Sequence, residues 1–261
     1  MPVTNIGSSW IGGKLFFQRK LAPKVDIPAL KDPSEYFEFF EDFIGNVNFP
    51  VATGVAGGWK GVGDATYTVV AAAGTLGGQV QVTPATGSNN EVYMQLGQLG
   101  TETFIEYTKS SGKKSWVEFR VAYTSVTNAG NTLIGLASEG AAAADFIADA
   151  GNDISDVDFV GFAVWEGAPA TCNAMHQITG SAFVEPGACQ TAVAGTFYTL
   201  GLYFDGKETV TWYVDGVAKQ TADLDTATFP TGEELSPIIA LKAGAADPTI
   251  QIDWIWMAVE R

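Results

Sequence analysis

The chain has 261 residues, of which 46% are hydrophobic and 16% are charged, and its formal net charge is −15 at pH 7. The hydrophobic content is ample for a packed core, and the acidic excess repels nucleic acid and anionic lipid at long range. No apolar stretch is long enough to span a bilayer, so we expect neither nucleic acid nor a membrane as a partner.

The N-terminal segment differs from the rest of the chain in charge and in pattern. Residues 1–31 carry five basic residues against one acidic residue, a net charge of +4, whereas residues 32–261 carry −19. Prolines and a lack of periodicity predict that residues 1–34 form an extended arm. The apolar side chains of the arm predict that it docks on a partner. The alternative is that its cations only keep the arm soluble. The candidate partner-binding residues are Trp10, Lys14, Phe16, Phe17, Arg19, Lys20 and Lys24. The first residues lack the pattern of a signal peptide, so we expect folding in a cytoplasm.

Residues 35–261 show the pattern of a single β-rich domain. The segment 35–44 fits a short helix or a strand, and we favour a strand. Further strand patterns, with turn residues between them, fall at 65–71, 79–83, 91–99, 103–108, 115–123, 131–137, 158–165, 237–242 and 249–259. The weakly helical segment 139–148 predicts a single surface turn. Because both faces of 249–259 are apolar, we expect a central strand, covered by the opposite sheet and by the arm or a long loop.

The only two cysteines, Cys172 and Cys189, flank a predicted hairpin that turns at Gly180-Ser181. Counting outward from a two-residue loop places the cysteines directly opposite each other as a non-hydrogen-bonded pair, where side chains approach most closely. A disulfide is then sterically possible. Pro186 would disturb the ladder, and a cytoplasmic origin favours free thiols. The sequence therefore leaves both alternatives open, a disulfide between the two cysteines and two free thiols.

The segment 196–219, TFYTLGLYFDGKETVTWYVDGVAK, predicts a three-stranded antiparallel meander. Its aromatic and β-branched runs are separated by Asp205-Gly206 and Asp215-Gly216, and Asp-Gly is typical of tight hairpin turns. With about a dozen strand patterns and almost no helical pattern, the sequence predicts an all-β, two-sheet antiparallel sandwich.

The same meander resembles strands of concanavalin A-like jelly rolls of the laminin-G and legume-lectin type. The segments FFEDFIGNVNFP, KSWVEFRVAY with GNTLIGLAS, DFVGFAVWEG and PIIALKAGAADPTIQIDWIWMAVER resemble concanavalin A-like proteins of tailed-phage virions, and NIGSSWIGGKLFF resembles the start of small phage structural proteins. The resemblance covers about residues 36–261. It implies a phage structural protein on the capsid exterior, a decoration or cement subunit that contacts the major capsid protein or other virion subunits as a homo-oligomer. A shared fold alone does not assign this function.

The sequence offers little that could carry catalysis. Concanavalin A-like glycosidases place carboxylates at alternate strand positions, but Glu118 is followed by Arg120 on its face and Glu102 with Glu106 lacks a third carboxylate. The single histidine, His176, reads as a sheet-face residue without a catalytic role. We therefore predict no enzyme, no catalytic residues and no cofactor.

One acidic loop has the residue types of a calcium site but not the spacing of an EF-hand. Its oxygen-bearing side chains are Asp149, Asn152, Asp153, Asp156 and Asp158. Because acidic loops are usually only solvated, we predict no metal site there.

A carbohydrate-binding module remains the alternative function, since this fold often presents an aromatic face to sugars. Trp59, Trp165 or Trp212 could serve that face, and each also fits a core position.

Overall fold

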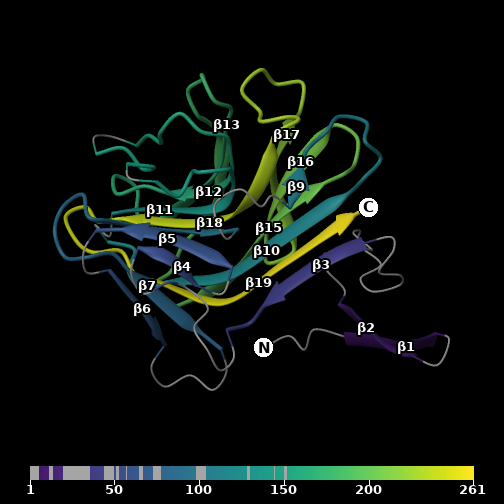
Figure 1. The fold of residues 1–261 in the computed structure, drawn as a ribbon, viewed down its shortest axis with the longest axis horizontal. Helices are drawn as coiled ribbons and strands as arrows, with labels where there is room; N and C mark the ends of the chain where they lie inside the picture. The colour runs from purple at the N-terminus through teal and green to yellow at the C-terminus, as the bar shows by residue number, and fades with distance from the viewer. Residues whose placement is uncertain are drawn as a thin grey trace.

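The computed structural model describes residues 6–11, 14–19, 36–43, 50, 53–56, 58–64, 67–72, 78–97, 104–127, 130–143, 145–149 and 152–261. These residues form strands and loops without a helix, so none of them belongs to a helix that could cross a membrane. Two antiparallel sheets lie face to face, and Figure 1 shows them as two layers. The predicted all-β, two-sheet antiparallel sandwich is confirmed.

The first layer, here called the β19 sheet, has eight strands. Its order is β17 (Val217–Asp223), β16 (Thr209–Val214), β15 (Phe197–Phe204), β10 (Ser115–Tyr123), β19 (Ile250–Glu260), β7 (Val80–Thr83) and β6 (Thr68–Ala71), and β3 (Tyr36–Glu41) also pairs with β19. The segment 35–44, which fitted a helix or a strand, is therefore a strand. As predicted, β19 is a central strand, because β10 lies on one side of it and β3 and β7 lie on the other.

The second layer, here called the β11 sheet, has nine strands. Its order is β14 (Val184–Thr191), β13 (Thr171–Gln177), β12 (Phe159–Val164), β11 (Asn131–Ser138), β18 (Glu234–Lys242), β8 (Glu91–Leu96), β5 (Trp59–Gly63) and β4 (Gly54–Ala56), and β9 (Ile105–Glu106) also pairs with β18. Sequence analysis did not predict β4 and β5, whose glycine-rich sequences weaken the strand signal.

The main core lies between the two sheets and follows the alternation of each strand. In β10, Val117, Phe119 and Val121 share one face, which points inward, and they are fully buried. They pack with inward side chains of the facing sheet such as Ile134 and Phe162. The alternate residues of both sheets form two further clusters on the outer faces.

The meander is formed by β15, β16 and β17, and its two Asp-Gly turns differ. Val214 pairs with Val217, and Asp215 and Gly216 have φ of 50° and 76°, so this turn is the predicted two-residue loop. The other turn is longer, because Phe204 pairs with Val210. There, Asp205 Oδ1 accepts hydrogen bonds from three successive backbone N–H groups.

The hairpin that carries the cysteines has a longer loop and a different register from the prediction. Cys172 lies opposite Gln190, and a register shift follows between Cys172 and Asn173. Cys189 falls at this irregularity, so the predicted direct opposition was wrong. The structure contains both cysteines as buried free thiols. Burial raises the pKa of Cys172 to about 12 and that of Cys189 to about 11, which keeps both thiols protonated.

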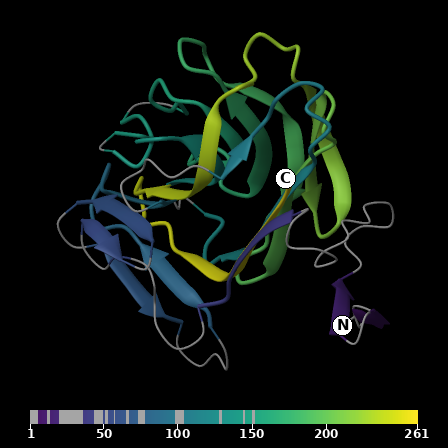
Figure 2. The same ribbon diagram turned by 45° about the vertical axis from the view of Figure 1, so that its right-hand side comes forward.

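Within the 1–34 arm the structure places a hairpin of β1 (Ile6–Ile11) and β2 (Lys14–Arg19), which the sequence analysis did not predict. These two strands pair with each other, and the pairings of the described residues join them to neither large sheet. In both ribbon views the hairpin lies outside the two layers (Figures 1 and 2). Lys20 and Lys24 lie outside the described residues.

Candidate functional site

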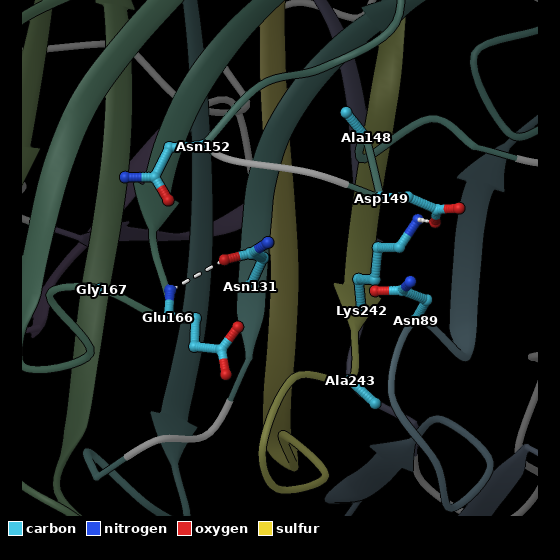
Figure 3. Close-up of a pocket in the computed structure, with 9 residues that line it drawn as sticks. All are labelled: Asn89, Asn131, Ala148, Asp149, Asn152, Glu166, Gly167, Lys242 and Ala243. Atoms are coloured by element: carbon cyan, nitrogen blue, oxygen red, sulfur yellow. Dashed lines mark hydrogen bonds and ion pairs between the residues drawn. The ribbon is translucent and has the colours of Figure 1, made fainter.

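A polar pocket of about 110 Å³ opens at one end of the β11 sheet. The ends of four strands and one loop meet there, and Figure 3 draws the residues that line the pocket. The lining residues are Asn89, Asn131, Ala148, Asp149, Asn152, Glu166, Gly167, Lys242 and Ala243. Asn131 begins β11, Glu166 follows β12, Lys242 ends β18 and Asn89 precedes β8, so the sheet topology positions this wall of the pocket.

The buried cation of the pocket is Lys242, whose side chain is 2% exposed. Its Nζ donates to the backbone carbonyl of Ile147 at 2.6 Å and lies 2.5 Å from Asp149 Oδ1 and 3.4 Å from Glu91 Oε2. Glu91 is also buried, whereas Asp149 is largely exposed. A buried ammonium needs such compensation, because its desolvation is costly. The loop containing Asp149 is therefore tied to the sheet through a charge.

Glu91 extends this network to the loop and to the sheet. Its Oε1 accepts a hydrogen bond from the backbone N–H of Asp145 at 2.8 Å, and its Oε2 accepts from the hydroxyl of Tyr93. The same hydroxyl accepts from the backbone N–H of Ile147 at 3.2 Å. Burial and the neighbouring Glu91 carboxylate raise the pKa of Tyr93, so this hydroxyl remains a donor. These groups fix residues 145–147 over the β11 sheet.

The opposite wall of the pocket is held by side-chain contacts to the backbone. Asn131 Oδ1 accepts from the backbone N–H of Glu166 at 2.8 Å, which Figure 3 marks, and Glu166 Oε1 accepts from the N–H of Ala245 at 2.6 Å. The pocket thus offers amide and carboxylate groups on a preorganised frame. Such groups suit a hydroxyl-rich ligand, because each hydroxyl both donates and accepts hydrogen bonds.

The loop beside the pocket also covers the outer face of the β11 sheet. Ala141, Phe146, Ile147 and Ile154 are buried against outward side chains of the strands, and the Phe146 ring lies 5.6 Å from that of Tyr93. The predicted surface turn at 139–148 is wrong in part: Glu139, Gly140, Ala143 and Asp145 are exposed, but Ala141, Ala142, Phe146 and Ile147 pack in a second core. The pocket therefore lies at the edge of the outer face of the β11 sheet, which this loop covers.

The acidic side chains that suggested calcium do not converge on one point. Asp149 pairs with Lys242, Asp156 accepts from the backbone N–H of Gly180, and Asp158 accepts from Thr179 at 2.9 and 3.1 Å. Within the described residues, the group spaced closely enough for a metal is instead Glu208, Asp223 and Asp225. All three are exposed, and Lys109 pairs with Asp225, so this group reads as a surface ion pair.

The tryptophans proposed for sugar contact are core residues. Trp59 and Trp212 are 0% exposed and Trp165 is 2% exposed, so none can stack on a ligand. His176 is buried, its ring lies 5.2 Å from that of Phe229, and its Nδ1 is 3.1 Å from the Thr228 carbonyl oxygen. Burial lowers the pKa of His176, which keeps the imidazole neutral in the core.

Sequence reasoning missed the pocket because its residues come from separate segments. Asn89, Asn131, Glu166 and Lys242 have no motif spacing, and strand pairing alone brings them together. One signal was present: Lys242 ends the otherwise apolar run PIIAL, and a lysine in such a strand requires a buried partner.

Comparisons with known proteins address the architecture. The sequence matches no family model and no curated protein. Among solved structures, peanut lectin has a TM-score of 0.56 at 13% identity, and the match covers 86% of this chain and 97% of the lectin. The carbohydrate recognition domain of Emp47p has a TM-score of 0.55 at 12% identity, covering 87% of this chain and 97% of that domain. A Bacillus licheniformis β-glucanase has a TM-score of 0.52 at 14% identity, covering 84% and 97%.

The fold is a concanavalin A-like jelly roll. At these identities the likeness shows the fold alone, since lectins and a glucanase share it. The parts of this jelly roll that could carry a function are the pocket, the outer faces of the two sheets and the arm.

Proposed function

We propose that the chain is a non-enzymatic structural protein of a tailed-phage virion, a capsid decoration or cement subunit. The observation that carries this proposal is the division of the chain. Residues from β3 to β19 form a sandwich of two paired sheets, whereas β1 and β2 pair only with each other among the described strands. The arm is the basic part of an acidic chain, and it carries Trp10, Phe16 and Phe17. Its attachment to the major capsid protein or to neighbouring subunits on the capsid exterior is the function we infer.

Two further observations support this proposal. The first is the resemblance of sequence segments within about residues 36–261 to concanavalin A-like proteins of tailed-phage virions. The outer face of the β11 sheet is packed with the chain's own loop, and the buried Glu91 is held by Lys242 and Tyr93 in a structural network. A carboxylate held in such a network stabilises the fold and is not free to act in hydrolysis. This favours a binding role for the protein over a hydrolytic one.

Binding to purified virions should depend more on the arm's aromatic residues than on its charges. We expect W10A/F16A/F17A to weaken binding at least about a hundredfold, because burial of a Phe-sized side chain contributes about 1.5–3 kcal/mol. Neutralising Lys14, Arg19, Lys20 and Lys24 together should weaken binding less, since exposed ion pairs contribute about 0–1 kcal/mol each. Co-sedimentation of the full chain with particles measures both effects.

The matched control is V193A, which alters an exposed apolar side chain of the sandwich. Its binding should equal that of the unchanged chain. Complete dissociation in about 1 M salt with the aromatic residues intact would show that charge dominates, since screening at that salt acts within about 3 Å. Absence of the chain from purified particles, tested by mass spectrometry, would overturn the proposed function itself.

A second candidate function is carbohydrate recognition, which the polar pocket favours. Its amide and carboxylate groups suit sugar hydroxyls, and peanut lectin shares the fold. A glycan array with the full chain tests this, and a clean negative would remove it. For any glycan bound, N89A/N152A should lower affinity about tenfold or more, because each hydrogen bond contributes about 0.5–1.5 kcal/mol. Gln190, which lies outside the pocket, supplies the control variant Q190A, whose affinity should not change.

A further inference from the structure

We propose that the outer face of the β19 sheet is a docking surface for the N-terminal arm of a second copy of this chain. This inference rests on the proposed function, in which the arm makes the contacts of assembly. It adds the surface that receives the arm and the kind of partner that supplies it.

The outer face of the β19 sheet carries a continuous row of aromatic side chains, here called the aromatic face. Its members are Phe40, Trp116, Tyr203, Tyr213, Trp254 and Trp256. Ring contacts join Trp116 to Tyr203 at 5.6 Å and to Tyr213 at 5.0 Å, and Phe40 to Trp254 at 6.4 Å. The row therefore crosses β16, β15, β10, β19 and β3, nearly the full width of the sheet.

Within the aromatic face, Trp116 and Trp256 are buried, Tyr203, Tyr213 and Trp254 are half-buried, and Phe40 is exposed. Trp116 lies close above Gly201, where a Cβ atom would be 3.1 Å from the indole, and the flanking tyrosines bury the ring fully. Its indole N–H is buried and has no hydrogen-bond partner among the described residues. Phe40, at the margin of the row, is 55% exposed. Phe40 and the half-buried Tyr203, Tyr213 and Trp254 leave aromatic surface accessible on the outside of the sandwich, and grouped accessible apolar side chains of this kind indicate an interaction surface.

Charge favours the arm as the occupant. Directly opposite residues of paired strands share a face, so Glu118 lies beside Trp256, and Asp253 is paired with Arg120 on the same face. Trp256 Nε1 donates to Glu38 at 2.7 Å, which adds another carboxylate beside the row. The face thus combines aromatic side chains with Glu38, the buried Glu118 and the Asp253–Arg120 ion pair, whereas residues 1–31 carry a net charge of +4 and three aromatic side chains. The two surfaces are complementary in both respects.

The geometry favours an arm from another copy. The chain's own hairpin lies outside the two layers in both views (Figures 1 and 2) and does not pair with the β19 sheet. Residues 20–35 separate β2 from β3, and a fully extended segment of that length spans at most about 55 Å. This reach is sufficient for exchange between neighbours, which closes into dimers or rings.

Sedimentation velocity of the purified full chain, without particles, tests the inference. We expect concentration-dependent self-association. The variant F40S/Y213S should weaken it at least tenfold, because both side chains belong to the aromatic face and are partly exposed. The matched control is V193S, since Val193 is 56% exposed but lies away from this face. Circular dichroism verifies that each variant is folded.

A mixing experiment identifies the arm as the occupant. F40S/Y213S retains an intact arm, and W10S/F16S/F17S retains an intact face. Each variant alone should be monomeric, and an equimolar mixture should form a heterodimer visible by native mass spectrometry. A wild-type chain that stays monomeric at all concentrations, self-association that ignores the face variant, or a mixture that stays monomeric would each overturn the inference. Binding to virions is measured separately, so the inference can fail while the proposed function stands.

Discussion

Replacement of Lys242 by methionine should lower the free energy of unfolding by about 3–5 kcal/mol, because removal of one partner leaves a buried charge without compensation. Glu91 is the charge left behind, since its side chain is 7% exposed and lies 3.4 Å from the lysine ammonium. The backbone carbonyl of Ile147 loses its 2.6 Å hydrogen bond at the same time. Urea unfolding followed by circular dichroism measures the change.

Two further variants distinguish the buried charge from the surface contact. D149N removes a carboxylate that is 62% exposed, and it should cost less than about 1 kcal/mol. The double variant E91Q/K242M should be more stable than K242M, because it removes the uncompensated carboxylate. Hydrogen exchange at residues 145–147 should accelerate in K242M, since the loop loses its tie to the sheet. Equal losses for K242M and D149N would contradict this account of the network.

Gly135→Ala should destabilise the sandwich by about 3 kcal/mol or more, at the upper end of overpacking effects. Gly135 and Gly161 lie directly opposite each other in β11 and β12. A Cβ atom on Gly135 would lie 2.3 Å from the Val160 carbonyl oxygen and 2.6 Å from the Gly161 Cα. Both are backbone atoms, so the strands themselves would have to separate.

The control for this substitution is another glycine in open space. A Cβ atom on Gly167 would have no heavy atom within 4 Å, so G167A should change stability by less than about 0.5 kcal/mol. Thermal unfolding of the two variants side by side provides the comparison. A G135A protein as stable as G167A would show that β11 and β12 can move apart at little cost.

The sequence was sufficient where local chemistry determines structure. The strand at 115–123 and the tight turn at Asp215-Gly216 were predicted, because both depend on neighbouring residues only. At Asp205-Gly206 the same motif formed a longer loop, since the aspartate caps three N–H groups beyond it. The cysteine hairpin has two register shifts: one opposite Pro186, between Ala174 and His176, and a second beside Cys189, between Cys172 and Asn173. Each moves the pairing by one residue, and only the first lies at the proline that the sequence singled out.

The site was less predictable because it depends on packing between distant segments. Nothing local indicates that Phe146 and Ile147 cover the β11 sheet, or that Asp149 meets Lys242 at 2.5 Å. Trp116 and Trp256 have the alternation of any strand, and only the pairing of β10 with β19 makes them part of one aromatic face. The hairpin within the arm was missed because an isolated pair of strands has no apolar face against a core to reveal it.

The central position of β19 determines when this protein can fold during its synthesis. The three neighbours of β19 in the sheet, β3, β7 and β10, are all translated well before it. Tyr36 of β3 pairs with Glu260 of β19, which is translated more than two hundred residues later. Until β19 leaves the ribosome, β3 has no partner strand and β10 lacks one of its two, so the main core between the sheets cannot close. Pairing across such sequence separation is slow, because the loop must close before contacts form. A chain interrupted before β19 therefore presents the arm without a completed sandwich, and the aromatic face exists only on chains translated through that strand.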